Sequence, residues 1–553
     1  MADGQRTSPR SDRSLAKTIL GAVVLLLIPA ACALAAMSSH VASGPGWVTP
    51  NYDVEYTYLL DALRFQQRLP ILFFIQPATT LAMLYAAIIH IAHAIAPVGN
   101  FDVVEDVWRY PDVYLDRVHA CLVVLLCSAS FAAGVLVWRR TRSLASGLAL
   151  QTGLILFAML AVSAGLIWPE TLTAVVGVLF AGTLVLFILD DGSSPRLCVA
   201  LGLLGALGIA TKLTFAIVTL APAVLSRSRK QAMLYLAVLI GGTVVLVAPI
   251  LGRIPQLIAF LAGFGTRTGD YGTGSAGLDM RTYLHGAELL VRQNKIPAAV
   301  IVISVGVLFA FRSRITLPGS PQRELRALGV LTLLELLQYA LVARQAYPRY
   351  LIPAVLLMGV NLVIIQRIGV PAGRRRGVVH ALFVLGFVFC SAGWLRNTAS
   401  AIASARSDTA DHLAIVEAAA SLRKSGAVVV MGLWASSPAR GLANAQFWAG
   451  NAWSTVAEKV YPGQLFLTGE GYLKTWQEGL GRGWDWPNVG PPLSHAAEEL
   501  EWRRFETLLK DRRVIAQGEW EGILPGLQRN PRISLHVIRR SRLESLIELR
   551  LRD

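Results

Sequence analysis

Residues 18–39 read TILGAVVLLLIPAACALAAMSS, and residues 51–58 follow soon after with NYDVEYTY. The first stretch carries no charged residue, and it is long enough to cross a hydrocarbon core of about 30 Å, which needs roughly 20 apolar residues in a helix. The second stretch places two carboxylates among aromatic side chains just beyond that span. Together they predict a membrane anchor followed by chemistry at the membrane surface.

Similar apolar stretches recur through the first 395 residues and then stop. Hydrophobic residues make up 54% of the chain and charged residues only 16%, which excludes an ordinary soluble globule. We therefore expect an α-helical polytopic membrane protein with about 11 transmembrane helices. The expected spans are residues 18–39, 118–138, 144–167, 170–189, 197–211, 213–225, 231–251, 297–311, 327–343, 349–366 and 377–395.

Charge placement predicts how these helices are oriented, because short cytoplasmic loops carry an excess of Lys and Arg. Basic clusters precede the first and last spans and follow the second, sixth and eighth. All these basic clusters lie on one side of the membrane only if residues 70–97 do not cross it. We therefore expect residues 70–97 to form an interfacial helix. The net charge of +16 is thus mainly topological, with some attraction to anionic membrane lipid. No nucleic-acid-binding module is recognisable.

This topology divides the chain into a cytoplasmic tail (1–17), a transmembrane domain (18–395) and a periplasmic C-terminal domain (396–553). Outer loops are expected at 40–117 and 252–296. In the first loop, residues 58–68 have helical spacing and are expected to lie along the membrane surface. In the C-terminal domain, strand-like stretches at 427–431, 513–517 and 534–538 alternate with helical patterns such as 496–509, which predicts a small α/β or α+β domain.

Four motifs occur in order along the transmembrane domain. They are Tyr52-Asp53-Val54-Glu55-Tyr56, the stretch from Leu69-Pro70 to Gln76-Pro77, Trp168-Pro169-Glu170, and Arg349-Tyr350 with Pro353. In their order along the chain, and in the side of the membrane that each is expected to reach, these motifs resemble the GT-C superfamily of membrane glycosyltransferases. That superfamily includes protein mannosyltransferases and the aminoarabinose transferase of lipid A. The resemblance covers residues 15–395.

The resemblance implies an inverting glycosyltransferase of a bacterial-type inner membrane, with its active site on the periplasmic face. A polyprenyl-phosphate-linked sugar is the implied donor, and the acceptor is a lipid, a glycan or a protein. The chemistry needs a carboxylate to take the acceptor's proton and cations to offset charge on the leaving phosphate.

Asp53 is the preferred base, with Glu55 as the alternative. Many members of the superfamily place two acidic residues side by side, whereas Val54 separates them here. On an extended segment residues 53 and 55 would point the same way, whereas on a helix they would diverge by about 200°. Glu170 is expected to orient the acceptor or to hold a divalent metal ion together with Asp53. Metal dependence stays open, and no other cofactor is expected.

Lys212, Arg344 and Arg349, with Tyr350 beside the last, lie at predicted outer helix ends, where a lipid phosphate would sit. Each assignment has a structural alternative. Asp53 and Glu55 also suit ordinary loop carboxylates, and Glu170 suits a helix N-terminal turn. Lys212 could instead be a lysine whose side chain snorkels to the membrane interface. Arg349 could instead anchor a helix end, with Tyr350 as a residue of the interfacial aromatic belt.

Residues 263–277 form a glycine-rich outer stretch that includes Arg267, Asp270 and Tyr271. Frequent glycine allows the backbone to approach a phosphate or a sugar closely, so a substrate-binding loop is predicted, with a plain linker as the alternative.

Two other classes of function stay open. One is a transporter or flippase of lipid-linked sugars, for which intramembrane charges should lie near the midplane. Most charges here fall at helix ends, with Glu335 as the main exception. The other is a noncatalytic assembly protein that acts through its C-terminal domain.

Overall fold

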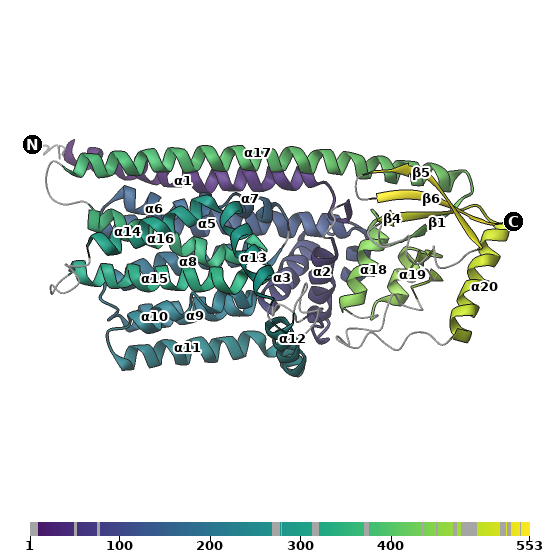
Figure 1. Ribbon diagram of the computed structural model, residues 1–553, viewed down its shortest axis with the longest axis horizontal. Helices are drawn as coiled ribbons and strands as arrows, with labels where there is room; N and C mark the ends of the chain where they lie inside the picture. Colours follow the sequence, from purple (N-terminus) through teal and green to yellow (C-terminus); the bar gives the residue numbers. More distant parts are fainter. Residues whose placement is uncertain are drawn as a thin grey trace, which may run out of the picture.

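The computed structural model is mostly helical, with a helical bundle at one end and a small sheet at the other (Figure 1). It describes residues 9–48, 52–73, 78–166, 168–267, 277, 279–311, 320–369, 375–432, 435–449, 452–467, 473–476, 495–519, 527, 532–541 and 544–552.

The first half of the bundle comprises α1 (Pro9–Ser43), α2 (Tyr52–Gln66), α3 (Thr79–Ile95), α4 (Val103–Arg109), α5 (Pro111–Thr141), α6 (Leu144–Ile155), α7 (Ala158–Gly165), α8 (Pro169–Leu189), α9 (Pro195–Thr211) and α10 (Leu220–Leu225). The second half comprises α11 (Arg229–Val247), α12 (Ile254–Thr266), α13 (Met280–Gln293), α14 (Lys295–Ala310), α15 (Ser320–Val342), α16 (Ile352–Gly369) and α17 (Arg375–Lys424). Short 3₁₀ helices precede or link them: η1 (Gly46–Val48), η2 (Leu213–Ala216), η3 (Ala248–Arg253) and η6 (Pro348–Leu351).

Six helical stretches of the described chain are long and apolar enough to cross a membrane, or seven if the bent pair α13 and α14 forms one span. This establishes a multi-pass membrane protein, but the expected count of about 11 spans is not confirmed. Several expected spans are short helices instead. The stretch 144–167, for example, is interrupted between α6 and α7, and α3, α6 and α9 each have fewer than 18 residues.

Ion pairs join the basic helix ends at the end of the bundle that lies far from the sheet. Arg140 pairs with Asp190, while Arg227 and Arg323 both pair with Asp191. The ends of α5 and α8 and the start of α15 therefore lie together. This is the arrangement expected of basic loops that share one side of a membrane.

The C-terminal region contains a mixed sheet built from β1 (Val428–Met431), β2 (Phe466–Leu467), β3 (Leu473–Lys474), β4 (Val514–Glu519), β5 (Ile533–Arg540) and β6 (Glu544–Leu551). The strand order is β3-β2-β1-β4-β6-β5, with β1 parallel to both β2 and β4. Helices α18 (Pro438–Ala449), α19 (Ser454–Val460) and α20 (His495–Asp511) complete it. The three strands and the helix expected from sequence are confirmed within a few residues.

Helix α17 connects the two regions without a break. It packs on α1 in the bundle and reaches the sheet at its far end (Figure 1). The expected domain boundary at residue 396 therefore falls inside one helix.

The sheet end is also fastened to the first outer loop. Lys459 donates to Glu105 Oε2 at 2.6 Å, and the Tyr461 hydroxyl donates to the Trp108 carbonyl at 3.2 Å. The ring of Trp476 meets that of Trp108 edge to face, with centroids 5.8 Å apart. Apolar aromatic contact of this kind contributes more to docking than an ion pair whose lysine is largely exposed.

Helix α2 differs from the expected surface helix. It begins at Tyr52 and packs between α3 and α18. Its side chains from Glu55 to Arg64 are therefore all buried, Asp61 completely so. The expectation failed because the covering helix α18 lies almost 400 residues away in sequence and leaves no local signal.

Candidate functional site

Three helix ends meet and position the residues of the candidate site. Pro169 starts α8 and leaves Glu170 in its first turn, where the helix dipole favours a carboxylate. Lys212 is the residue that caps the C-terminus of α9, where the dipole favours a cation. Pro348 starts η6, which carries Arg349 and Tyr350 between α15 and α16.

One carboxylate oxygen faces both cations of this group. Lys212 Nζ donates a hydrogen bond to Glu170 Oε1, and Arg349 Nε lies 3.6 Å from the same oxygen. The side chains of Lys212 and Glu170 are 2% and 3% exposed, and that of Arg349 is 16% exposed. With all three ionised the group carries one net positive charge in a poorly solvated place, which suits an anionic ligand.

Aromatic rings hold the two cations in position. The guanidinium carbon of Arg349 lies 4.8 Å from the ring centroid of Trp168, 5.4 Å from that of Tyr347 and 5.6 Å from that of Tyr350. The ammonium of Lys212 lies 4.6 Å from the Tyr350 ring. Cation–π contacts in a desolvated site orient a cation without neutralising it.

The backbone of η6 is tied to α15 as well. The side-chain amide of Gln338 donates to the Tyr350 carbonyl at 2.9 Å, and both residues are buried. We infer that α15 sets the position of the segment that carries Arg349.

The structure therefore unites four of the residues predicted from sequence: Glu170, Lys212, Arg349 and Tyr350. Lys212 does not snorkel to an interface, since it is buried against Glu170. Glu170 is more than an isolated helix-start residue, because its carboxylate is held by two cations.

The acidic motif of the first loop is helical rather than extended. Positions 53 and 55 lie in α2 and so diverge by about 200° around its axis. Glu55 is 3% exposed, and its Oε2 lies 2.8 Å from where a Cβ on Gly46 would stand, so a larger residue at position 46 would collide with it. The side chain of Asp53 lies outside the described part of the structure.

Two residues of α2 that were given no role from sequence face the same region. Tyr58 is 1% exposed, and its hydroxyl has no hydrogen-bond partner among the described residues. Burial raises the Tyr58 pKa well above its ordinary value, and the charge of Glu170 raises it further. That influence places the Tyr58 hydroxyl within electrostatic reach of the Glu170 group.

Asp61 lies one turn further along α2. Its two carboxylate oxygens accept hydrogen bonds from the backbone N–H groups of Leu72 and Phe73, each at 3.1 Å. Burial nevertheless raises the Asp61 pKa to about 7, against the opposing effect of those hydrogen bonds. The three-residue spacing of Tyr58 and Asp61 predicts that they share one face of a helix. The sequence does not predict that this face is buried.

Arg344 makes hydrogen bonds to the glycine-rich stretch. One of its guanidinium nitrogens donates to the Arg267 carbonyl at 2.6 Å and lies 3.5 Å from the Gly277 carbonyl, so Arg344 joins the two described ends of the glycine-rich stretch. The predicted loop residues Asp270 and Tyr271 lie outside the described residues.

Among the described residues, Glu170 is poorly placed to hold a metal ion. The Glu170 oxygen that faces the site already meets Lys212 and Arg349, whose charges repel a divalent cation. Within the described ranges, no group of three or more His, Cys, Asp or Glu side chains is placed to hold a metal ion.

Comparisons with known proteins give a likeness at the level of structure only. No family model and no curated protein matches the chain. The structure is similar to that of ArnT from Cupriavidus metallidurans bound to undecaprenyl phosphate, with 12% identity, a TM-score of 0.47 and coverage of 95% of this chain and 97% of that chain. It is also similar to ArnT from the same organism in the apo state, with 13% identity, a TM-score of 0.45 and coverage of 97% and 98%.

Proposed function

We propose that this protein is a glycosyltransferase that moves a sugar from a polyprenyl-phosphate donor to a lipid, glycan or protein acceptor at the outer face of a membrane. The observation that supports this function is the buried, net positive group of Glu170, Lys212 and Arg349 at the ends of membrane helices. The phosphate of a membrane lipid lies at the boundary of the hydrocarbon core, which is also where membrane helices end. A cationic group in this position can therefore contact the donor phosphate.

The reaction proposed is a single displacement. The acceptor oxygen or nitrogen attacks the anomeric carbon, its proton passes to a carboxylate, and the bond to the donor phosphate breaks with its electron pair remaining on the phosphate. Lys212 and Arg349 stabilise that charge, Lys as a point charge and Arg through parallel N–H groups. Glu170 acts as a positioning residue that holds both cations.

Asp53 is the proposed base, with Glu55 as the alternative, both from the sequence motif. Donor lipid of this class matches the undecaprenyl phosphate of the ArnT structure named above, although the proposal rests on the buried charges. Inversion at the anomeric carbon follows from a single displacement.

The test is transfer of label from a panel of radiolabelled polyprenyl-phosphate sugars to a membrane extract, using wild type, Asp53→Asn and Lys212→Met. We expect wild type to transfer the label and Asp53→Asn to transfer none. When binding of polyprenyl phosphate is measured, we expect it to be weakened only in Lys212→Met. The matched control is Lys230→Gln, an exposed lysine at the start of α11. Full transfer by Asp53→Asn would exclude Asp53 as the base.

A second candidate is a transporter or flippase of lipid-linked sugars, and one buried carboxyl favours it. Glu335 in α15 is fully buried, and the Asn361 amide donates to its two oxygens at 2.9 and 3.0 Å. Isolated acids within spans often mark ion pathways. Two results together would favour the transporter. Wild type would move labelled donor across the membrane of proteoliposomes without transferring its sugar, and Glu335→Gln would lose that movement.

A further inference from the structure

Two buried hydrogen-bond donors close to the Glu170 group have no acceptor among the described residues. They are the hydroxyl of Tyr58 and the indole N–H of Trp168, and both atoms are shielded from solvent. A buried donor without a partner costs free energy, and native structures satisfy nearly all such donors. Unpaired donors beside a buried cationic group therefore indicate that a ligand supplies the acceptors.

Trp168 lies against one of the two cations. The guanidinium carbon of Arg349 is 4.8 Å from its ring centroid, and Glu170 follows it by two residues at the start of α8. The indole N–H can only donate. An acceptor for this N–H would lie close to the Arg349 guanidinium, which favours an anionic oxygen.

Helix α3 connects α2 to the end of α9 that carries Lys212. The rings of Tyr58 in α2 and Tyr85 in α3 meet with their centroids 6.3 Å apart. Thr80, at the start of α3, shares a hydrogen bond of 2.7 Å with Thr211, the residue before Lys212. These contacts tie the part of α2 that carries Tyr58 to the cationic end of α9.

The Tyr58 hydroxyl also lies within electrostatic range of the charged group. Burial is the main cause of its raised pKa, and the charge of Glu170 comes next, followed by the opposing effects of Asp61 and Arg349. The hydroxyl therefore stays protonated at neutral pH and can donate a hydrogen bond. It adds a donor without changing the net charge of the group.

The leaving phosphate of the proposed reaction needs more than the two cations supply. A sugar-loaded polyprenyl phosphate is a diester with one negative charge, which the single net positive charge of the Glu170 group balances. When the bond to the sugar breaks, the phosphate becomes a monoester with close to two negative charges above its second pKa of about 6. Neutral donors stabilise this added charge without burying another cation.

We infer that Tyr58 and Trp168 bind the donor phosphate as neutral hydrogen-bond donors beside Lys212 and Arg349, and that they hold it more strongly once the sugar has left. The inference rests on the proposed function, because that function supplies polyprenyl phosphate as the ligand. Its test measures binding alone, so neither the sugar nor the acceptor needs to be known.

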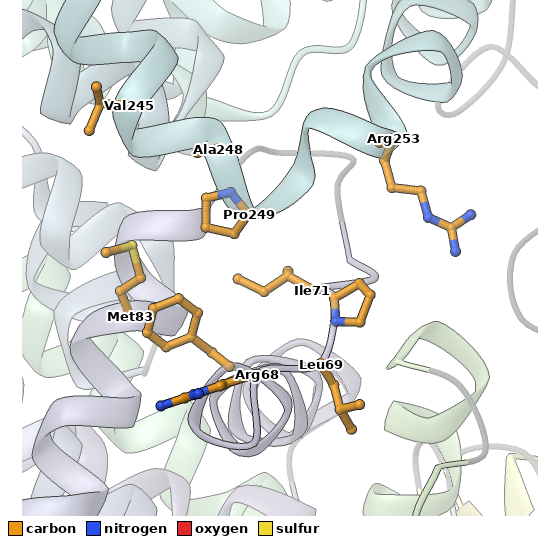
Figure 2. Close-up of a pocket in the computed structure, with 11 residues that line it drawn as sticks. Arg68, Leu69, Ile71, Met83, Val245, Ala248, Pro249 and Arg253 are labelled. Atoms are coloured by element: carbon orange, nitrogen blue, oxygen red, sulfur yellow. The ribbon is translucent and has the colours of Figure 1, made fainter.

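A larger pocket on the flank of the bundle provides a control. It has a volume of about 820 Å³, and Figure 2 shows Met83 and Pro249 beside it and the side chain of Arg253 turned away from it. The residues that line it include no member of the Glu170 group and neither of the two neutral donors. Arg253→Gln therefore removes a positive charge outside the proposed contact.

The test is titration of the detergent-solubilised full-length protein at pH 8 with undecaprenyl phosphate and with its methyl ester, a diester that carries one negative charge. Tyr58→Phe and Trp168→Phe each remove one donor and keep an aromatic ring. The matched controls are Tyr339→Phe and Trp394→Phe, which each remove another buried donor without a partner among the described residues.

We expect Tyr58→Phe and Trp168→Phe each to weaken binding of undecaprenyl phosphate about tenfold, the usual size for a hydrogen bond to a charged group, and to weaken binding of the methyl ester less. The two matched controls and Arg253→Gln should bind as wild type does. Without ligand, Tyr58→Phe should unfold at the same midpoint as wild type or at a higher one, because the lost hydroxyl has no partner in the folded protein.

Unchanged binding by both Tyr58→Phe and Trp168→Phe, with binding lost in Lys212→Met, would overturn the inference and leave the proposed function standing. A lower unfolding midpoint of ligand-free Tyr58→Phe would also overturn it, since the hydroxyl would then have a partner within the protein. Equal weakening of both esters would contradict the stronger hold on the free phosphate. No binding of undecaprenyl phosphate by wild type would refute the proposed function and the inference together.

Discussion

Replacing Glu170 by Gln leaves Lys212 and Arg349 buried side by side without their shared counter-charge. At 3.6 Å, the attraction between Arg349 Nε and Glu170 Oε1 amounts to about 4–5 kcal/mol for an effective dielectric constant of roughly 20. Solvent screening reduces this because Arg349 is 16% exposed, whereas Lys212 is almost fully buried. Removal of one partner from a buried pair typically costs about 3–5 kcal/mol.

A double-mutant cycle separates the pair from its surroundings. We expect Glu170→Gln and Lys212→Met each to lower the free energy of unfolding by about 3–5 kcal/mol. The double variant should lose less than the sum by at least about 2 kcal/mol, because it removes both members of the most deeply buried pair and leaves only the partly exposed Arg349 without its counter-charge. Denaturant titration of the detergent-solubilised protein, followed by tryptophan fluorescence, measures all three.

The matched control is the pair of Lys459 and Glu105, in which the lysine is exposed. The Lys459 side chain is 62% exposed, so Lys459→Met should leave the unfolding midpoint nearly unchanged. Additive losses at Glu170 and Lys212, with no coupling between them, would refute the view that these two residues form one buried unit.

Three other outcomes are expected. Arg349→Lys should keep the fold but weaken polyprenyl-phosphate binding about tenfold, because the planar contact with Trp168 is lost, and direct titration of the lipid measures this. Asp61 has a pKa of about 7 in the folded protein and about 3.9 when unfolded. Its contribution to stability is therefore fully present below pH 4 and is lost as pH rises to 7, by about 4 kcal/mol in total, and a flat difference between wild type and Asp61→Asn from pH 4 to 8 would contradict it. Trp476→Ala should cost about 3–5 kcal/mol and free the C-terminal region for limited proteolysis, because its ring fills the contact with Trp108.

Much of the architecture was predictable because its signals are local. Apolar runs of membrane length, basic loop ends and strand-like stretches are properties of neighbouring residues, and α1, α5, α8 and β1 lie where these patterns place them. The break between α6 and α7 was not predictable, since hydropathy measures composition and not the local geometry that ends a helix.

The order of residues along the chain was enough to predict a membrane protein with cations and carboxylates at its helix ends. Which of these side chains meet depends on how the helices pack. The tertiary structure joined Glu170 to Lys212 and Arg349 from three separate helix ends, and it assigned Arg344 to the glycine-rich stretch instead. It also buried Asp61 beneath a helix from the far end of the chain. Contacts between distant segments depend on how the helices pack, and packing leaves no periodic trace in the residues that it brings together.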